Sequence, residues 1–393
     1  MSEEKFLKEL VRIRREIHRY PELGSGEFKT AKLIEKVLTS LKISHKRAAK
    51  TGVVAVLGNK SASKKTRAPR CIALRADMDA LPLTEKTNKP YRSKNPGVMH
   101  ACGHDAHVSM LLGAAMILSR KKFPGTVKLF FQPNEEGAGG ARSLISQGAM
   151  RNPVVDAVVG LHVNPRLPTG VVGLKEGPLM AAVDKFTIEV LGAGGHAAYP
   201  HEGKDAVLIA SEIVGSLQSI ASRKIDPLEP VVVTVGMFHS GARYNILAEK
   251  AVLTGTVRTL SEKTHRRVPE LIRQIADGVT RAHGGSFKLI YERIGSVLSN
   301  TPSVVKLSRR VAMNLFGQSK VQELDTASMG GEDFAEYLKI SPGCFIYMGT
   351  GNKSLRTEIP WHHAQFDLDE KAMPAGAKLL AGITEEFLSG CPE

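Results

Sequence analysis

The 393-residue chain is poor in cysteine, in aromatic residues and in long apolar runs. Its four cysteines are widely and irregularly spaced and form no CxxC pair, which excludes a disulfide framework and a zinc ribbon. No run approaches the roughly 18 apolar residues that a membrane-spanning helix needs. The N-terminal stretch MSEEKFLKEL is charged and amphipathic rather than a signal peptide. We therefore expect a soluble, cytoplasmic protein with no membrane partner.

The formal net charge of +15 raises the question of a nucleic-acid partner. Aromatic residues make up only 5% of the chain, and no RNP, finger or basic-zipper motif is present. The densest basic run, residues 60–70, is polar and lies between two strand-like segments, which predicts a solvated loop. These features indicate no nucleic acid partner, and the charge then favours solubility or an anionic substrate.

The length predicts about two domains. Strands alternate with helices up to residue 182 and again after residue 296, which is typical of an α/β fold. The strands are expected at residues 53–57, 71–74, 127–131, 157–161 and 344–348, and the helices near 3–20, 27–41, 108–118, 141–147, 302–315 and 370–388. We expect a discontinuous α/β domain, residues 1–182 and 296–393, with a largely parallel central sheet.

Residues 183–295 have a different pattern. Strands that alternate polar and apolar residues are expected at 185–190, 231–235, 251–258 and 286–291, with helices at 205–221 and 262–282. The order β-α-β-β-α-β is that of the ferredoxin-like, split βαβ arrangement. This segment is therefore predicted to be an inserted α+β domain.

Residues that can bind a metal ion follow successive strands of the first domain. In an open α/β sheet, such loops gather at the carboxyl ends of the strands. Thiolate, imidazole and carboxylate together suit zinc, and the last two also suit manganese, cobalt or nickel. The candidates are Asp77 and Asp79 in LRADMDALP, Cys102 and His104 in MHACGHDAHV, Glu135 and Glu136 in FQPNEEG, His162 in GLHV, and the histidines of WHH at 361–363.

Each of these features has an alternative interpretation. The histidines around Cys102 could belong to a helix start with Asp105 as a plain N-cap residue. Cys102 could be a nucleophile with a histidine base. A Glu-Glu pair is often a solvated loop, and a single histidine such as His162 is often structural. Their joint placement after successive strands favours a metal site.

Seven motifs resemble one known family and occur in its order. They are RADMDALP, HACGHDAH, FQPNEEGAGGA, GLHVNP, GAGGHAAYPH, MGGEDFAEY and WHHAQFDLDE. The chain resembles the M20 metallopeptidases over roughly residues 5–388. It is most similar to their amidohydrolase subfamily of carboxypeptidases, hippurate hydrolases, N-acyl-amino-acid amidohydrolases and indole-acetyl-amino-acid hydrolases. HxCGHD with a downstream EEGxGG is the most specific part of this pattern.

The resemblance implies a site with two divalent metal ions, expected to be zinc, with manganese, cobalt or nickel as alternatives. It implies Cys102, His104, Glu136, His162 and His362 as metal ligands. It also implies Glu135 as general base and Asp79 as the residue that orients a ligand.

In the inserted domain, the resemblance implies a lid through which the chain forms a homodimer or tetramer. His196 would reach a neighbouring active site and stabilise the oxyanion. Asn245 and Arg258 would bind the substrate carboxylate, for which a planar guanidinium offers bidentate geometry. The expected activity is hydrolysis of the amide bond of an N-acyl amino acid or short peptide with a free carboxylate. The alternative is a catalytically silent protein that binds amino-acid conjugates on the same fold.

Three positions depart from the family pattern. His363 and Ala364 replace the residues that usually follow the ligand histidine, and we assign His362 as the ligand from the phase set by Phe366. Asn134 stands where alanine is more frequent, and Leu247-Ala248 where Ile-Pro is frequent. None of these changes removes a chemical group that the expected reaction needs.

Overall fold

The computed structural model describes residues 2–58 and 70–390, which divide into two compact units. Unit 1 consists of residues 1–177, 299–325 and 333–393, and unit 2 of residues 178–298 and 326–332. The predicted boundaries at 183 and 295 lie inside unit 2, near its ends. Most of the basic run expected to be a loop, residues 60–69, lies outside the described residues, as does Cys391.

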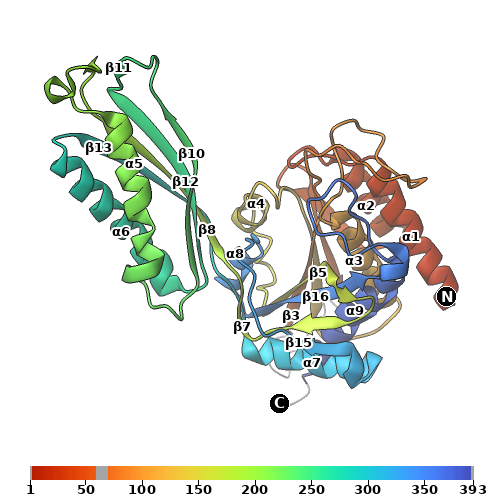
Figure 1. Ribbon diagram of the computed structural model, residues 1–393. Coiled ribbons are helices and arrows are strands. Elements are labelled where there is room, and N and C mark those ends of the chain that lie inside the picture. The colour runs from red at the N-terminus through yellow and green to blue at the C-terminus, as the bar shows by residue number, and fades with distance from the viewer. Residues whose placement is uncertain (1, 59–69, 391–393) are drawn as a thin grey trace. The chain divides into compact units, whose positions relative to one another are not determined.

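Unit 1 is built on an eight-stranded sheet (Figure 1). Its four central strands, β4, β3, β5 and β16, are parallel to one another. On the two sides of this group, β2 pairs with β4 and β6 pairs with β16, both antiparallel. The α/β fold with a largely parallel sheet is therefore confirmed. In spatial order the strands are β1 (Ser44–Ala48), β2 (Gly52–Gly58), β4 (Thr126–Gln132), β3 (Cys71–Asp77), β5 (Ala157–Pro168), β16 (Gly343–Gly351), β6 (Val172–Leu174) and β15 (Val321–Glu323).

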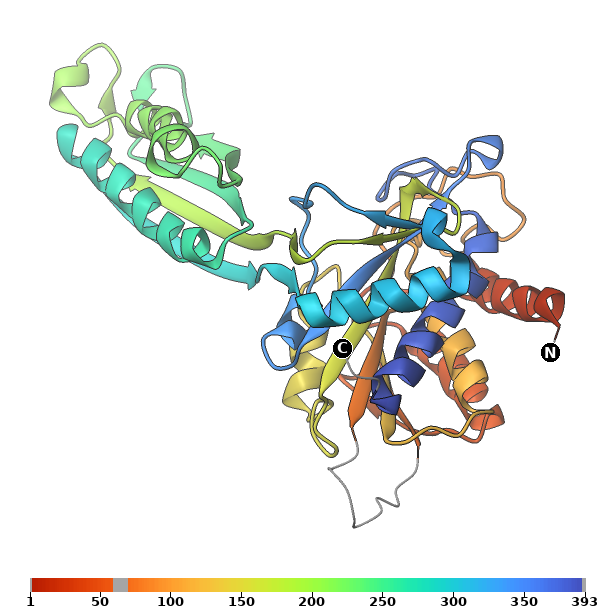
Figure 2. The same ribbon diagram turned by 90° about the horizontal axis from the view of Figure 1, so that it is seen from below.

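Helices cover both faces of this sheet (Figures 1 and 2). On one side lie α1 (Glu3–Arg19), α2 (Phe28–Ser40), α3 (His104–Leu118) and α9 (Met373–Ser389), and on the other α4 (Gly140–Ser146) and α8 (Ala335–Leu338). Helix α7 spans Pro302–Phe316 and packs on α9. Nearly every residue of α3 is buried, which explains why its sequence is apolar on all sides. Gly113 lets α3 approach α9 closely, because a Cβ there would lie 2.8 Å from the Cβ of Ala377.

The parallel strands place the candidate site residues at one edge of the sheet. Strand β3 ends at Asp77, and β4 ends at Gln132, directly before the segment that carries Glu135 and Glu136. Strand β5 is longer than predicted, so His162 lies within it, opposite Tyr347 of β16, rather than after its end. The long apolar runs of these strands fit their burial on both faces.

Unit 2 has the expected β-α-β-β-α-β order. Its antiparallel sheet has the strand order β10-β12-β8-β13, which is that of a ferredoxin-like fold. The elements in chain order are β8 (Ala182–Leu191), α5 (Ala206–Leu217), β10 (Val231–Ser240), β12 (Lys250–Thr259), α6 (Glu262–Ala282) and β13 (Ser286–Gly295). A separate core that includes Phe186, Ile213 and Leu253 holds the two helices on the sheet. Within residues 2–58 and 70–390, no helix is both long and apolar enough to span a bilayer.

Candidate metal centre

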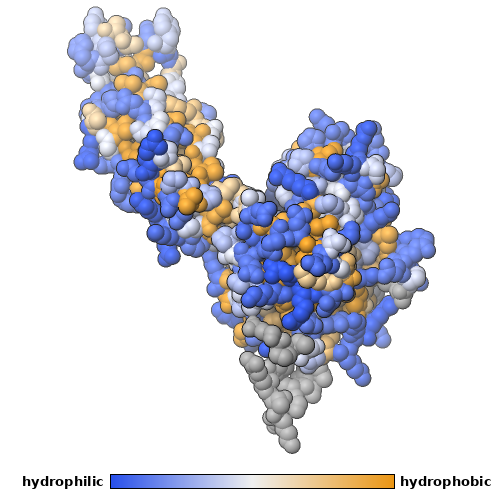
Figure 3. Space-filling model, turned by 60° about the horizontal axis from the view of Figure 1, so that its bottom comes forward, coloured by the Kyte–Doolittle hydropathy of each residue, from blue (hydrophilic) through white to orange (hydrophobic). Residues whose placement is uncertain are grey.

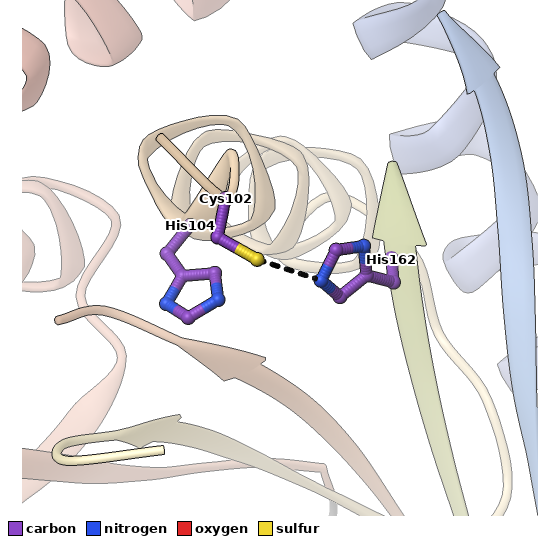
Figure 4. A group of neighbouring side chains, drawn as sticks. All are labelled: Cys102, His104 and His162. Carbon is purple, nitrogen blue, oxygen red and sulfur yellow. Dashed lines mark hydrogen bonds between the residues drawn. The ribbon is translucent and has the colours of Figure 1, made fainter. Parts of the chain in front are cut away.

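The five predicted metal ligands come together in unit 1. The donor atoms form three overlapping groups, and within each group all atoms lie within 4.8 Å of one another. Cys102 belongs to two of the groups, so one cluster contains all five residues. The groups are Cys102, His104 and His162 (Figure 4); Cys102, Glu136 and His362; and His104, Glu135 and Glu136. Glu135, the predicted base, therefore lies beside the ligands.

The start of α3 determines where His104 lies. Gly103 occupies the N-cap position with φ 91°, a left-handed conformation that glycine adopts without strain. A Cβ on Gly103 would lie 2.4 Å from Cγ2 of Val163, so only glycine fits. The prediction that Asp105 is the N-cap residue was wrong. Asp105 lies inside the first turn, where Arg14 and His18 hold its carboxylate at 2.8 Å.

Two of the predicted ligand histidines are oriented by hydrogen bonds from Nδ1. In His104 this nitrogen lies 3.2 Å from Oδ1 of Asp79, and in His162 it lies 2.8 Å from the carbonyl oxygen of Val163. These partners accept a hydrogen bond, so Nδ1 of each ring carries its proton and Nε2 is the nitrogen that can bind a metal ion. Nε2 of His104 is buried with no hydrogen-bond partner among the described residues, and Nε2 of His162 lies 3.4 Å from Sγ of Cys102. This arrangement fits metal ligation.

The surroundings of Cys102 suit a ligand better than a nucleophile. Burial raises the pKa of its thiol to about 12, so the thiol stays protonated at neutral pH unless a cation is present. The nearby His104 ring does not overcome this effect. A bound divalent ion stabilises the thiolate directly. The interpretation of Cys102 as a nucleophile with a histidine base is therefore disfavoured.

His362, rather than His363, faces the cluster. Its backbone N–H donates to the carbonyl oxygen of Ala101 at 2.8 Å, and its Nε2 lies 3.3 Å from Oε1 of Glu136. That oxygen is buried and has no hydrogen bond from any described residue. The ring of His363 instead accepts the N–H of Gln365. This geometry supports His362 as the ligand, as the phase set by Phe366 predicts.

Sequence reasoning left His107 unassigned and named Asp77 only as one of the candidate metal-binding residues. Nδ1 of His107 lies 2.6 Å from Oδ1 of Asp77, and its Nε2 accepts the N–H of Val163 at 2.9 Å, next to His162. Burial raises the pKa of Asp77, but the charges of His104 and Arg75 outweigh burial and hold the pKa well below its usual value. Asp77 is thus an anion that supports the ligand histidines. The signal in the sequence was Arg75, because Arg75 and Asp77 are the two charged residues of a strand that is otherwise apolar.

Asp333 of the GGEDF motif was also missed. Its carboxylate accepts hydrogen bonds from Arg75 at 3.0 Å, Gln132 at 2.7 Å and the N–H of Ala141 at 3.0 Å. Burial raises its pKa to about 6 despite the Arg75 charge. Asp333 therefore joins the ends of β4 and α4, which flank the segment containing Glu135.

The remaining predicted residues lie in unit 2. His196 of β9 (Gly195–His196) pairs with Ile246 of β11 (Ile246–Leu247), which brings it next to Asn245. The carbonyl oxygen of Asn245 accepts the N–H of Ala197 at 3.2 Å. Arg258 lies apart from them on β12, opposite Val183 and Val232. Their roles in catalysis and substrate binding stay predictions.

Asp79 offers a direct test of ligand orientation. Asp79→Asn removes the negative charge that fixes the His104 ring, and we expect metal affinity to fall roughly 10- to 100-fold. Competition with a chromophoric chelator measures this affinity. The matched control is Asp156→Asn, because Asp156 accepts a backbone N–H from Cys71 at the opposite end of β3. Equal affinities for the two variants would contradict the role of Asp79.

Comparison with known proteins agrees with this geometry. The family model for peptidase family M20/M25/M40 matches residues 73–386. An N-acetyl-L-cysteine deacetylase of Bacillus subtilis is 40% identical over 98% of this chain and 90% of its own length. Thermostable carboxypeptidase 1 of Saccharolobus solfataricus is 36% identical over 96% of this chain and 95% of its own.

A solved structure is similar as well. The B. subtilis YXEP protein, described as a dinuclear metal-binding peptidase of the M20 family, superposes with a TM-score of 0.86 at 33% identity. The match covers 98% of this chain and 99% of that one. The clustered donors of this chain likewise suit two divalent metal ions. The chain therefore belongs to peptidase family M20/M25/M40 and is a metal-dependent amidohydrolase.

Proposed function

We propose that the chain hydrolyses the amide bond of N-acyl amino acids or short peptides that end in a free carboxylate. The observation that carries this proposal is the position of Glu135, whose carboxylate lies within 4.8 Å of donor atoms of His104 and Glu136. A carboxylate beside a metal centre, but not needed as its ligand, can move a proton during hydrolysis. The deacetylase and carboxypeptidase relatives act on amide bonds of this kind by their names.

Each residue then has a distinct role. Cys102, His104, Glu136, His162 and His362 would hold the two ions, and the donor set favours zinc, with manganese, cobalt and nickel as alternatives. Divalent ions bound there supply Lewis-acid polarisation of the substrate carbonyl and make water more acidic. Glu135 takes the proton of the attacking water and delivers it to the departing amine. Asp79 keeps the His104 ring in place.

The position of the ring proton of His196 suits oxyanion stabilisation. Its Nδ1 accepts the N–H of Ala198 at 3.0 Å, which assigns the proton to Nε2. The exposed ring thus offers an N–H donor. We propose that it serves the active site of a neighbouring subunit in a dimer or tetramer.

Apolar surface on unit 2 supports association through this unit. Edge strand β10 exposes Met237 and Phe238, and Tyr244 and Ile246 are exposed near β11. Figure 3 shows apolar side chains among hydrophilic ones on the drawn face of unit 2. Sizing in solution tests this association, and a monomer that hydrolyses its substrate at full rate would contradict the role of His196.

Arg258 and Asn245 are proposed to bind the substrate carboxylate. The Arg258 guanidinium is half-buried, and burial lowers its pKa even though the charge of Asp184 acts in the opposite direction. The side-chain oxygen of Asn245 is buried without a partner among the described residues. The Asn245 amide can be flipped to present its donors. A cationic side chain and an unpaired polar group of this kind favour an anionic ligand.

Arg258→Ala is expected to raise KM roughly 10- to 100-fold for an N-acetyl amino acid, because a charge-assisted hydrogen bond contributes about 1.5–3 kcal/mol. The same substrate with its carboxylate converted to an amide should be hydrolysed poorly by the wild type and no worse by the variant. Arg293→Ala is the matched control, because Arg293 is an exposed residue of β13 that pairs with Asp184 of β8. An unchanged preference for the free carboxylate in Arg258→Ala would refute this role.

A panel of N-acetyl, N-benzoyl and N-carbobenzoxy amino acids and dipeptides tests the proposed reaction, with each candidate metal supplied in turn. We expect release of the free amino acid from at least one acyl class. Binding of these compounds without turnover under every metal would instead favour the catalytically silent binding protein.

A further inference from the structure

The segment that carries Glu135 is held from both sides by buried carboxylates. Oε1 of Glu27 accepts the backbone N–H of Asn134 at 2.9 Å. Oδ2 of Asp79 accepts the backbone N–H of Glu136 at 3.0 Å. The two hydrogen bonds fix the backbone N–H groups of the residues immediately before and after Glu135, so they limit how far its backbone can move.

Glu27 is unusual for a residue at the start of a helix. It occupies the N-cap position of α2, but its side chain makes no capping hydrogen bond to that helix. The residue is fully buried, and its second carboxylate oxygen accepts the hydroxyl of Thr51, which is also fully buried. A buried carboxylate is costly unless it is hydrogen-bonded. Its cost here is offset by contacts with Thr51 and with the segment before Glu135, rather than by helix capping.

The conformation of Asn134 makes this contact possible. Asn134 has φ 52°, in the left-handed region that asparagine tolerates better than most residues. Its side chain fits between two glycines, since a Cβ on Gly24 or Gly137 would lie 2.2 Å or 2.4 Å from its Oδ1. Its carbonyl oxygen accepts the N–H groups of Gly139 at 3.3 Å and Gly140 at 3.2 Å. The left-handed turn therefore directs its own N–H toward Glu27.

We propose that Glu27 is a positioning residue for Glu135. By accepting the Asn134 N–H, Glu27 holds the turn that places the Glu135 carboxylate beside the metal ligands. This inference rests on the proposed function, because it takes Glu135 as the base of that reaction. Among the described residues, the Glu27 carboxylate accepts hydrogen bonds from Thr51 and Asn134, and neither of these is one of the proposed metal ligands.

Glu27→Leu removes the acceptor at similar volume. We expect kcat to fall about 100-fold, the scale of a misplacement near 1 Å, with KM changed less than about threefold and metal content unchanged. Glu27→Gln keeps an acceptor for Asn134, and its amide can donate to the Thr51 hydroxyl, so it should recover most of kcat. Glu27→Asp keeps the charge but is one methylene too short, and it serves as the second variant if Glu27→Leu does not fold.

The matched control is Glu22→Leu. Glu22 precedes the same helix, and its carboxylate accepts the N–H groups of Lys29 and Thr30 in α2 rather than any group near Glu135. Its loss should lower the melting temperature with little change in kcat. If Glu22→Leu and Glu27→Leu lost kcat equally, the effect would come from α2 and the proposal would be overturned. If Glu27→Gln were no better than Glu27→Leu, the hydrogen bond to Asn134 would not be the cause of the effect, and the proposal would also be overturned.

Amide hydrogen exchange tests the contact without relying on turnover. The Asn134 N–H should be protected in the metal-loaded wild type and in Glu22→Leu, but should exchange faster in Glu27→Leu and Glu27→Asp. Unchanged exchange in both Glu27 variants would overturn the proposal. A separate result tests the proposed reaction: full turnover in Glu135→Gln would contradict it. Even then, the exchange rate of the Asn134 N–H would still show whether Glu27 holds this segment.

Discussion

Replacing Glu135 with glutamine lowers kcat by an expected 10²- to 10⁴-fold, the usual contribution of a positioned general base. Glutamine has nearly the same shape but cannot take a proton from water. KM should change little, because the residue acts on water and on the leaving amine rather than in substrate binding. Steady-state kinetics with the best N-acyl amino acid measures both constants.

The neighbouring residue provides the control for this experiment. Glu136→Gln makes the same chemical change one position along the chain, but removes a proposed metal ligand. We expect metal content, measured by atomic emission, to fall in Glu136→Gln and to stay at the wild-type level in Glu135→Gln. Full turnover in Glu135→Gln, or loss of metal from it, would show that Glu135 is not the base.

Removal of metal should abolish hydrolysis completely. The donor atoms of Cys102, His104 and His162 are buried together, and without cations Cys102 and His104 keep protons that prevent them from binding a metal ion. Burial raises the pKa of Cys102 to about 12, and Asp77 raises that of His104 above its usual value against the effect of burial. Dialysis against a chelator followed by an activity assay provides the measurement, and adding back zinc or manganese should restore activity.

The dependence of reconstitution on pH follows from the same pKa shifts. Because both groups hold their protons more tightly than usual in the metal-free protein, metal binding must release protons. Apparent metal affinity should therefore fall as the pH is lowered, and protons should appear in unbuffered solution on metal addition. Activity that survives chelation but is lost on thiol alkylation would instead support a cysteine nucleophile.

The fold was largely predictable because each layer has a local sequence pattern. Apolar runs bounded by turns predicted β3, β4, β5 and β16, and helical spacing of apolar residues predicted α1, α2 and α9. The strands β1, β6 and β15 were not predicted, because β1 is polar and exposed along most of its length, and β6 and β15 have only three residues each. In the structure β1 pairs with β2, whereas β6 pairs with β16 and β15 with β6, strands that are distant from one another in sequence.

The candidate ligands were predictable because their residue types and spacing carry the chemistry. Cys102 with His104, and Glu135 with Glu136, point to a metal site wherever the chain places them. Their supports were not predictable, because Asp77 with His107, Asp333 with Ala141, and Glu27 with Asn134 are pairs distant in sequence. Nothing in one member of such a pair indicates the other.

The sequence by itself determined the α/β and ferredoxin-like architecture, the family and the candidate donor residues, since these depend on local pattern and residue chemistry. The tertiary structure decided which atoms of these residues can bind a metal ion. It assigned the protons of His104 and His162 to Nδ1, turned His362 rather than His363 toward Glu136, and buried Cys102. The physical reason is that hydrogen-bond partners, burial and electrostatic surroundings are set by residues far away in the chain, which meet only when it folds.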